Sequence, residues 1–264
     1  MVFKEKLGVS IVERYPGVTE SLVAHGIRYM EVRIVKGNDP DLIRRLISIA
    51  LDEKSKSGIK SPTLHLPQMQ SFDLSQTDEE LRLKALENQK KILDICLPVE
   101  PEIVVIHPSA PGEVSREEAA ARKAALIRSL KDFCPYCKAL GLKVAVENLT
   151  GGSMVQTSDD LLEIMEAVGD NIGICFDVNH LLTEPISDFI RKAGKHIITM
   201  HVSDNDGIRE RHFFPGDGVI DWKGLFSELK NINYDSYMIA ECGVLANFPD
   251  TISEFCEKWR RLHA

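Results

Sequence analysis

The strongest constraint on the fold is an alternation that runs along the whole chain. A short run rich in β-branched residues is followed by a longer stretch with helical periodicity, and this happens eight times. The predicted strands are 6–12, 29–35, 61–67, 102–109, 143–149, 172–180, 196–204 and 236–243. The predicted helices are 17–26, 39–58, 78–98, 115–141, 157–169, 185–194, 221–232 and 248–262. Eight such units in 264 residues predict a (β/α)8 barrel, that is, a TIM barrel.

The main competing architecture is a doubly wound sheet, and the sequence argues against it. Such sheets usually have fewer strands, and no glycine-rich dinucleotide fingerprint follows any predicted strand. No linker, low-complexity tract or change of composition divides the chain. We therefore expect one barrel domain over residues 1–264.

Charge and composition narrow the functional classes. The net charge is −8 and the isoelectric point is near 5.5, which argues against the basic face that nucleic-acid binding needs. The longest apolar runs are far shorter than the roughly 20 residues of a membrane helix, and the first residues do not resemble a signal peptide. Six scattered cysteines fit a reducing compartment. We expect a cytoplasmic protein that contacts neither nucleic acid nor a membrane.

One cysteine pair has the spacing of a redox motif. Cys134 and Cys137 lie in "CPYC", but they come late in a helical pattern and not at a helix start that follows a strand. Their neighbours at helical spacing are apolar, which favours packing over redox chemistry. Pro135 is expected to kink this helix locally.

Polar side chains gather at the carboxyl ends of the predicted strands, where TIM barrels carry their chemistry. The residues at or just beyond those ends are Glu31, Arg33, His65, His107, Glu147, Asp177, His180, His201, Glu210, His212 and Glu241. A single strand-end histidine or glutamate is often a structural hydrogen-bonding residue, and Glu31 with Arg33 could form an ion pair. The coincidence over successive strands weakens that interpretation.

Carboxylates that converge on one barrel mouth would repel each other without a cation, because an isolated buried charge is costly. A mixture of carboxylate and imidazole suits Zn²⁺, Mn²⁺, Co²⁺ or Fe²⁺ better than Ca²⁺. Glu147, Asp177, His201 and Glu241 are the strongest candidates for ligands. His65 and His107 are weaker ones.

Four segments resemble those of the xylose-isomerase-like TIM barrels, a family of sugar isomerases, epimerases and inosose-processing enzymes. They are "VAVENLTG", "CFDVNHLL", "HVSDNDG…RHFFPGDGVIDW" and "IAEC", and the resemblance is strongest from 143 to 243. It implies one divalent metal ion (Mn, Zn or Co) on Glu147, Asp177, His201 and Glu241. It also implies that Glu147 and Glu241 exchange a proton with opposite faces of a carbon next to a carbonyl. His180 would contact a substrate hydroxyl or carbonyl.

A more distant branch of the resemblance is the apurinic endonuclease IV type, which holds up to three Zn. Its ligand pattern would fall on His65, His107, Glu147, Asp177, His180, His201, Glu210, His212 and Glu241. The sequence departs from that branch at Glu210, where the branch has the shorter Asp. This departure and the acidic isoelectric point put a full three-zinc site in doubt.

The sequence therefore predicts a metal-dependent isomerase or epimerase of a sugar, an inosose or a sugar phosphate. A multi-zinc phosphodiesterase is the alternative, and a non-enzymatic sugar-binding barrel is a third hypothesis. Glu210 and His212 bind either a second metal or substrate. Arg209 and Arg211, and the loop 243–250, could hold a phosphate or carboxylate, or could simply be solvated. The expected partner is a small carbohydrate, with a homodimer or tetramer as candidate assemblies.

Overall fold

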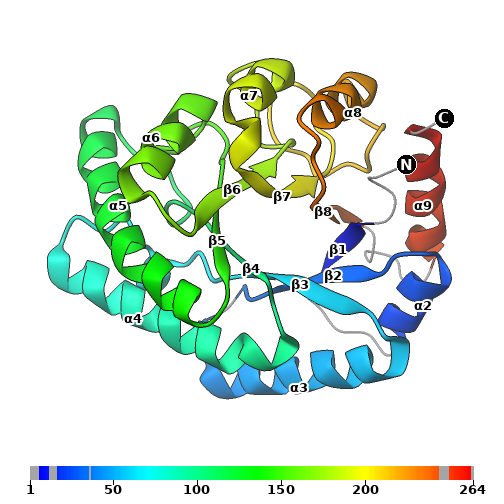
Figure 1. Cartoon of the computed structure of the whole chain (residues 1–264), viewed down its shortest axis with the longest axis horizontal. Helices are drawn as coiled ribbons and strands as arrows, with labels where there is room; N and C mark the ends of the chain where they lie inside the picture. Colours follow the sequence, from blue (N-terminus) through cyan, green and yellow to red (C-terminus); the bar gives the residue numbers. More distant parts are fainter. Residues whose placement is uncertain (1–5, 12–16, 36, 244–249, 263–264) are drawn as a thin grey trace.

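The computed structural model describes residues 6–11, 17–35, 37–243 and 250–262. Eight parallel strands close into one barrel in the order β1 to β8, with the helices outside it (Figure 1). The strands are β1 (Leu7–Ile11), β2 (Tyr29–Arg33), β3 (Lys60–His65), β4 (Ile103–Ile106), β5 (Lys143–Glu147), β6 (Ile172–Asp177), β7 (Ile197–Val202) and β8 (Tyr237–Ala240). The predicted TIM barrel is confirmed.

An outer helix follows each strand of the barrel. These helices are α2 (Val18–Ala24), α3 (Pro40–Ser57), α4 (Glu79–Cys96), α5 (Arg116–Ala139), α6 (Ser158–Val168), α7 (Ile186–Ala193), α8 (Trp222–Asn231) and α9 (Asp250–Leu262). Short 3-10 turns lie at Gln70–Phe72, Leu97–Val99 and Gly194–His196. Every predicted strand and helix has its counterpart, with ends that differ by a few residues, although the start of the helix predicted from 248 lies outside the described residues.

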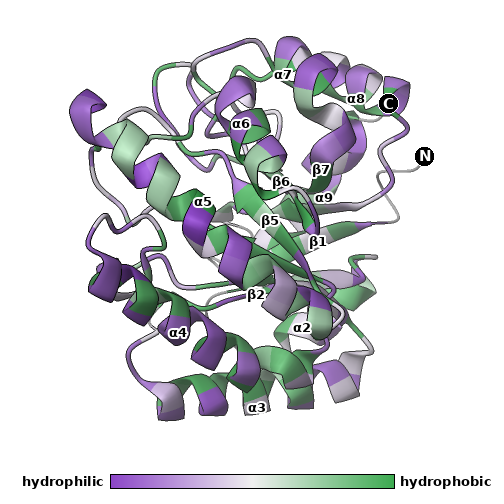
Figure 2. Ribbon diagram, turned by 60° about the vertical axis from the view of Figure 1, so that its left-hand side comes forward, coloured by the Kyte–Doolittle hydropathy of each residue, from purple (hydrophilic) through white to green (hydrophobic). Residues whose placement is uncertain are grey.

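Local signals in the sequence fix several helix starts. Ser115 and Glu118 form a reciprocal capping box at α5, and Thr157 and Asp160 form another at α6. Asp221 caps α8 by accepting from the amide of Gly224 at 2.9 Å. Residues along α3, α4 and α5 alternate between hydrophobic and hydrophilic, as expected for helices with one face against a sheet (Figure 2). Within the described ranges, no helix combines the length and apolar composition that crossing a bilayer requires.

The two-residue period of the strands sorts side chains between two cores. In β5, Val144 and Val146 pack in the large core between sheet and helices, whereas Ala145 belongs to a small cluster inside the barrel. In β6, Cys175 belongs to the same inner cluster. Glu147 lies two residues after Ala145, and Asp177 lies two residues after Cys175. The strand period therefore points these acids into the mouth of the barrel.

The cysteine pair on α5 packs in the core. Cys134 and Cys137 are buried free thiols in the large core, and α5 continues without interruption through Pro135. Burial raises the pKa of both thiols, which makes them poor nucleophiles. The packing interpretation of these cysteines is the one that the structure supports.

Candidate functional site

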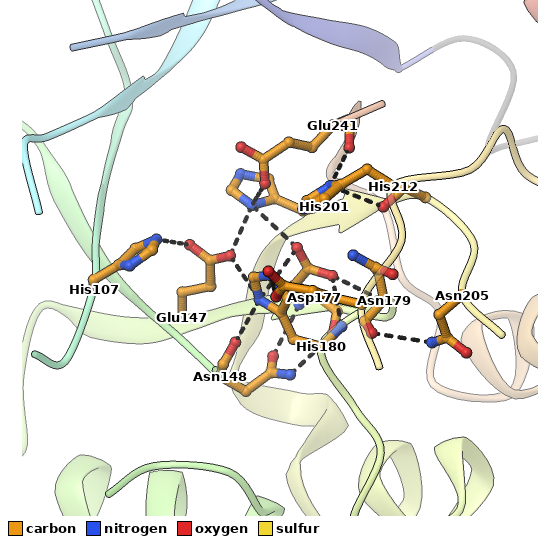
Figure 3. A network of polar contacts seen from close by, with 12 residues as sticks. His107, Glu147, Asn148, Asp177, Asn179, His180, His201, Asn205, His212 and Glu241 are labelled. Atoms are coloured by element: carbon orange, nitrogen blue, oxygen red, sulfur yellow. Dashed lines mark hydrogen bonds and ion pairs between the residues drawn. The ribbon is translucent and has the colours of Figure 1, made fainter. Parts of the chain in front are cut away.

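The ends of four strands bring their polar residues to one point. Glu147, Asp177, His201 and Glu241 each place one nitrogen or oxygen atom within 4.8 Å of those of the other three. The first three side chains are fully buried, and Glu241 is 8% exposed. Figure 3 shows their polar atoms pointing toward one another from β5, β6, β7 and the residue after β8. The four predicted ligands thus form one cluster.

His201 lies at the centre of this cluster. Its Nδ1 is 3.2 Å from Glu147 Oε1, 3.3 Å from Glu241 Oε2 and 3.8 Å from Asp177 Oδ2. Its Nε2 lies 3.1 Å from Glu31 Oε2, and the other oxygen of Glu31 accepts from Ser10 Oγ at 2.9 Å. A carboxylate that accepts from one ring nitrogen fixes the ring so that the other nitrogen can bind a metal. Glu31 therefore orients His201.

Glu147 is surrounded by histidines. Its Oε1 is 3.2 Å from His201 Nδ1 and 3.3 Å from His180 Nδ1. Its Oε2 is 3.1 Å from His107 Nε2 and 3.2 Å from His65 Nε2. His65, His107 and Glu147 form a second group with metal-ligand spacing, which shares Glu147 with the first group.

The two residues whose role the sequence left undecided form a third group with His180. His180 Nε2 is 3.1 Å from Glu210 Oε2, and the rings of His180 and His212 are 6.0 Å apart between centroids. The Nδ1 of His212 contacts the backbone oxygen of Glu241 at 2.7 Å. The longer side chain at Glu210 therefore does not keep this residue from joining the group.

The electrostatics of the site reflect these contacts. Burial alone would raise the pKa of Glu31 and Glu147, but the surrounding histidines outweigh it. The pKa of Glu31 falls from 4.5 to about 2, and that of Glu147 falls well below 4.5. The pKa of Asp177 is raised by burial and by the charge of Glu147. Burial would lower the pKa of His201, but Cys175, Glu31 and Glu147 raise it well above 6.5. Burial would likewise lower the pKa of His180, but Asp177 and Glu147 raise it well above 6.5.

A divalent cation fits this set of groups. Asp177 Oδ2 is buried and accepts no hydrogen bond within the described part of the chain, although His180 Nδ1 lies 3.4 Å away, so this oxygen is available to bind a cation. Glu147, Asp177 and Glu241 carry acidic groups in one buried cluster, where repulsion between them favours a bound cation. Mixed carboxylate and imidazole donors match Zn²⁺, Mn²⁺ or Co²⁺.

A cleft of about 360 Å³ opens over the cluster. Its described lining residues are Arg33, Gln68, His107, Ser109, Ala110, Pro111, Gly112, Glu113, Leu149, Thr150, Gly151, Ser153, His180, Glu210, His212 and Glu241. Of the weaker predictions for substrate contact, Arg33 lines this cleft. Glu31, Arg209 and Arg211 are not among its lining residues.

The contacts of these weaker candidates explain their positions. Glu31 is fully buried with both oxygens engaged. The ion pair that Glu31 and Arg33 could have formed is not among the described contacts, and Arg33 pairs with Glu241. Arg209 and Arg211 are exposed, and Arg211 Nε pairs with Asp206 at 2.5 Å. Residues 244–249 of the loop after β8 lie outside the described residues.

Comparison with known proteins places this barrel in a family. The family model described as "Xylose isomerase-like TIM barrel" matches residues 20–258. The chain belongs to this family.

Several proteins of known sequence or structure resemble this xylose isomerase-like barrel. An uncharacterised protein of Methanocaldococcus jannaschii is 28% identical over 172 residues, which are 65% of this chain and 66% of that relative. Fructoselysine 3-epimerase of Escherichia coli O157:H7 is 22% identical over 177 residues, 64% of this chain and 63% of the relative. The chain thus spans less than two thirds of the length of either curated relative.

Two solved structures share the fold over nearly the full length. A D-tagatose 3-epimerase-like protein superposes with a TM-score of 0.78 at 23% identity, covering 98% of both chains. The apo form of 3-keto-D-glucoside 4-epimerase from E. coli superposes with a TM-score of 0.77 at 19% identity, again over 98% of both. At these identities the likeness establishes the fold of this family member.

Sequence reasoning missed the amides that hold the site of this family member together. Asn148 follows β5 and pairs with Asp177 twice: its Nδ2 donates to the Asp177 carbonyl and its Oδ1 accepts from the Asp177 amide, both at 2.9 Å. Asn179 Oδ1 accepts from the amide of Arg211 at 3.1 Å, which ties the loop after β7 to the end of β6. Because a backbone group offers the same donor and acceptor at almost every residue, no residue pattern in the chain indicates these bonds.

Asp204 is a third residue that the sequence did not reveal. It is fully buried, and its Oδ2 accepts from Gly216 N at 2.9 Å and from Trp222 Nε1 at 2.7 Å. Its Oδ1 accepts from Ile220 N at 3.1 Å. Asp204 thereby folds the loop that carries Glu210 back over the barrel mouth. The polar "SDN" after a strand was its only signal.

Proposed function

We propose that this protein is a divalent-metal-dependent isomerase or epimerase of a sugar or a sugar derivative. The observation that carries the proposal is the buried group of Glu147, Asp177, His201 and Glu241 at the mouth of the barrel. The relatives named as sugar epimerases support the same chemistry. When bound there, the metal would polarise the substrate carbonyl and stabilise the enediolate that proton removal creates.

The chain's own residues would transfer the proton. Glu241 lines the cleft, whereas Glu147 approaches the cluster from β5, so the two carboxylates come from different strands. One would take the proton from the carbon next to the carbonyl, and the other would return it. His180 lines the same cleft and would hydrogen-bond a substrate hydroxyl or carbonyl. A single-base variant of the scheme would use only one glutamate.

Deuterium incorporation from D₂O tests this proposal directly. A panel of ketoses, inososes and sugar phosphates is incubated with protein supplied with Mn²⁺, Co²⁺ or Zn²⁺, and exchange at carbon is read by NMR. Glu147→Gln and Glu241→Gln should each lower exchange by at least about 100-fold, because acid–base groups contribute that much or more. The matched control is Glu53→Gln. Glu53 is a buried acid that is hydrogen-bonded to Thr19 and lies far from the site residues in the sequence. Full exchange in both site variants would refute the scheme.

A second candidate function is phosphodiester hydrolysis by several zinc ions. The observation that favours it is the pair of additional groups, His65 with His107 and Glu147, and His180 with Glu210 and His212. In that arrangement Glu147 would be shared between two metal sites and would have no oxygen free for proton transfer. Up to three zinc ions would then bind per chain.

Metal counting separates the two candidates. About one metal per chain after dialysis supports the isomerase, and three zinc ions support the hydrolase. His107→Ala should then lower the zinc count and any cleavage of bis(p-nitrophenyl) phosphate together. An affinity for duplex DNA that falls steeply with salt would also favour the hydrolase. The metal, the assembly and the cytoplasmic location remain predictions.

A further inference from the structure

Arg33 is a partly buried cation with one charged partner among the described residues. It ends β2 at the barrel mouth, and its side chain is 19% exposed. A guanidinium carries five N–H donors and is always charged. Within the described residues, its partner is one oxygen of Glu241. Arg33 also lines the cleft described above, so a ligand bound in that cleft can supply acceptors to its other donors.

The neighbours of Arg33 supply an independent sign of a ligand. Ser109, just beyond β4, lines the same cleft at 3% exposure, and its hydroxyl has no hydrogen-bond partner within the described chain. Gln68, just beyond β3, also lines the cleft, and its Oε1 is likewise buried and unpaired. Nitrogen and oxygen of such an amide can exchange places by a flip, so Gln68 can donate.

Barrel topology places these three residues on one wall. Arg33 is in register with His65 on β3, and His65 is in register with Val105 on β4. The ends of β2, β3 and β4 are therefore neighbours. Across the cleft, Glu210 is engaged by His180, and Glu113 is exposed at the rim. Among the described lining residues, Arg33 bears the one fixed positive charge.

We propose that Arg33, Ser109 and Gln68 form a subsite for an oxyanion of the substrate, so that the sugar turned over here carries a carboxylate or a phosphate. The inference rests on the proposed function, because it names the substrate class of the same site. The cleft of about 360 Å³ lies at the small end of ligand pockets and suits one sugar unit with one charged substituent. A metal held by Glu241 would compete with Arg33 for that carboxylate.

Three probes that differ only at one carbon test the subsite. D-fructose, D-fructuronate and D-fructose 6-phosphate are titrated by calorimetry into the Mn²⁺-loaded full-length protein. At least one anionic probe should bind about 10- to 100-fold more tightly than D-fructose, the range expected for charge-assisted hydrogen bonds. Whether that probe is the uronate or the phosphate distinguishes the two sources of the oxyanion.

Variants assign the preference to this wall of the cleft. Arg33→Met should abolish the anion preference, Arg33→Lys should keep part of it, and Ser109→Ala should reduce it. Arg44→Met is the matched control, since Arg44 is an exposed arginine of α3 paired with Asp41 at 2.8 Å. Circular dichroism checks that each variant folds. If Arg33→Met does not fold, the Arg33→Lys and Ser109→Ala variants are used to test the subsite instead.

The outcomes decide between the two proposals. The subsite is overturned if neither anion binds more tightly than D-fructose, or if the preference survives in Arg33→Met. Deuterium exchange is measured in parallel. Anion binding through Arg33 without exchange in any probe leaves the subsite standing and counts against the isomerase. Exchange in D-fructose without anion preference supports the isomerase and removes the subsite.

Discussion

Replacing Glu31 with Gln tests whether the centre depends on a residue outside the four candidate metal ligands. Glu31 is fully buried, and its Oε2 lies 3.1 Å from His201 Nε2. Its pKa, lowered from 4.5 to about 2, corresponds to about 3 kcal/mol of favourable interaction with its charged form. Because the folded-state pKa is depressed, this stabilisation is present above about pH 4.5 and is lost as the pH falls toward 2. At neutral pH the effect is therefore fully expressed.

The expected result is a loss of metal affinity in a protein that still folds. In Glu31→Gln the new side-chain amide can still accept a hydrogen bond from His201, but the charge that holds the ring is gone. Loss of such a supporting carboxylate typically weakens metal binding by about 10- to 100-fold, or about 1.4–2.7 kcal/mol.

Competition with a fluorescent chelator at pH 7 measures the metal affinity of wild type and Glu31→Gln for Mn²⁺, Co²⁺ and Zn²⁺. Glu53→Gln is the control, because Glu53 is also buried and accepts from Thr19 Oγ1 at 2.7 Å. It should lose stability without losing metal. The reasoning would be refuted if Glu31→Gln bound metal within about twofold of wild type, or if Glu53→Gln weakened metal binding as much.

Three further predictions concern metal removal, the loop after β7 and acid stability. Metal added at about 100 times its Kd to protein first stripped of metal by a chelator should stabilise the fold by about 2.7 kcal/mol, since Asp177 Oδ2 then gains a partner. The Tm measured by calorimetry should rise by about 5–10 °C. An unchanged Tm would contradict a metal at this cluster. Asp204→Asn should lower the free energy of unfolding, measured with urea, by about 2–4 kcal/mol, because the new amide group places donors against Gly216 N, Ile220 N or Trp222 Nε1. Asp206→Asn, at the more accessible start of the loop, should lower it by less. Burial would raise the pKa of Asp160, but bonds from Lys123 and Thr157 lower it, so its stabilisation is present above pH 3.8 and lost as the pH falls. Asp160→Asn should accordingly cost about 1–2 kcal/mol at pH 7 and progressively less as the pH falls below 3.8, and an equal cost at neutral and acid pH would contradict this role of Asp160.

The positions of the candidate ligands could be predicted from the sequence because side chains alternate between the two faces of a strand. Once "VAVENL" and "ICFDVNH" are recognised as barrel strands, Glu147 and Asp177 must face the same interior as Ala145 and Cys175. Their position at the carboxyl end then follows from chain direction alone. Sequence reasoning could thus place these residues at the mouth, although their binding of a metal remains a prediction.

By itself, the sequence determined the barrel, the inward-facing acids and histidines, and the family. These depend on periodicity and helix signals that act over a few residues. The tertiary structure decided which partner each group has: Glu31 supports His201, Arg33 turns to Glu241, and Glu147 lies among four histidines. Glu31 and His201 are 170 positions apart in the chain, and Arg33 and Glu241 are still further apart. Such pairings depend on register and on side-chain directions around a closed barrel, and no local pattern in the chain encodes them.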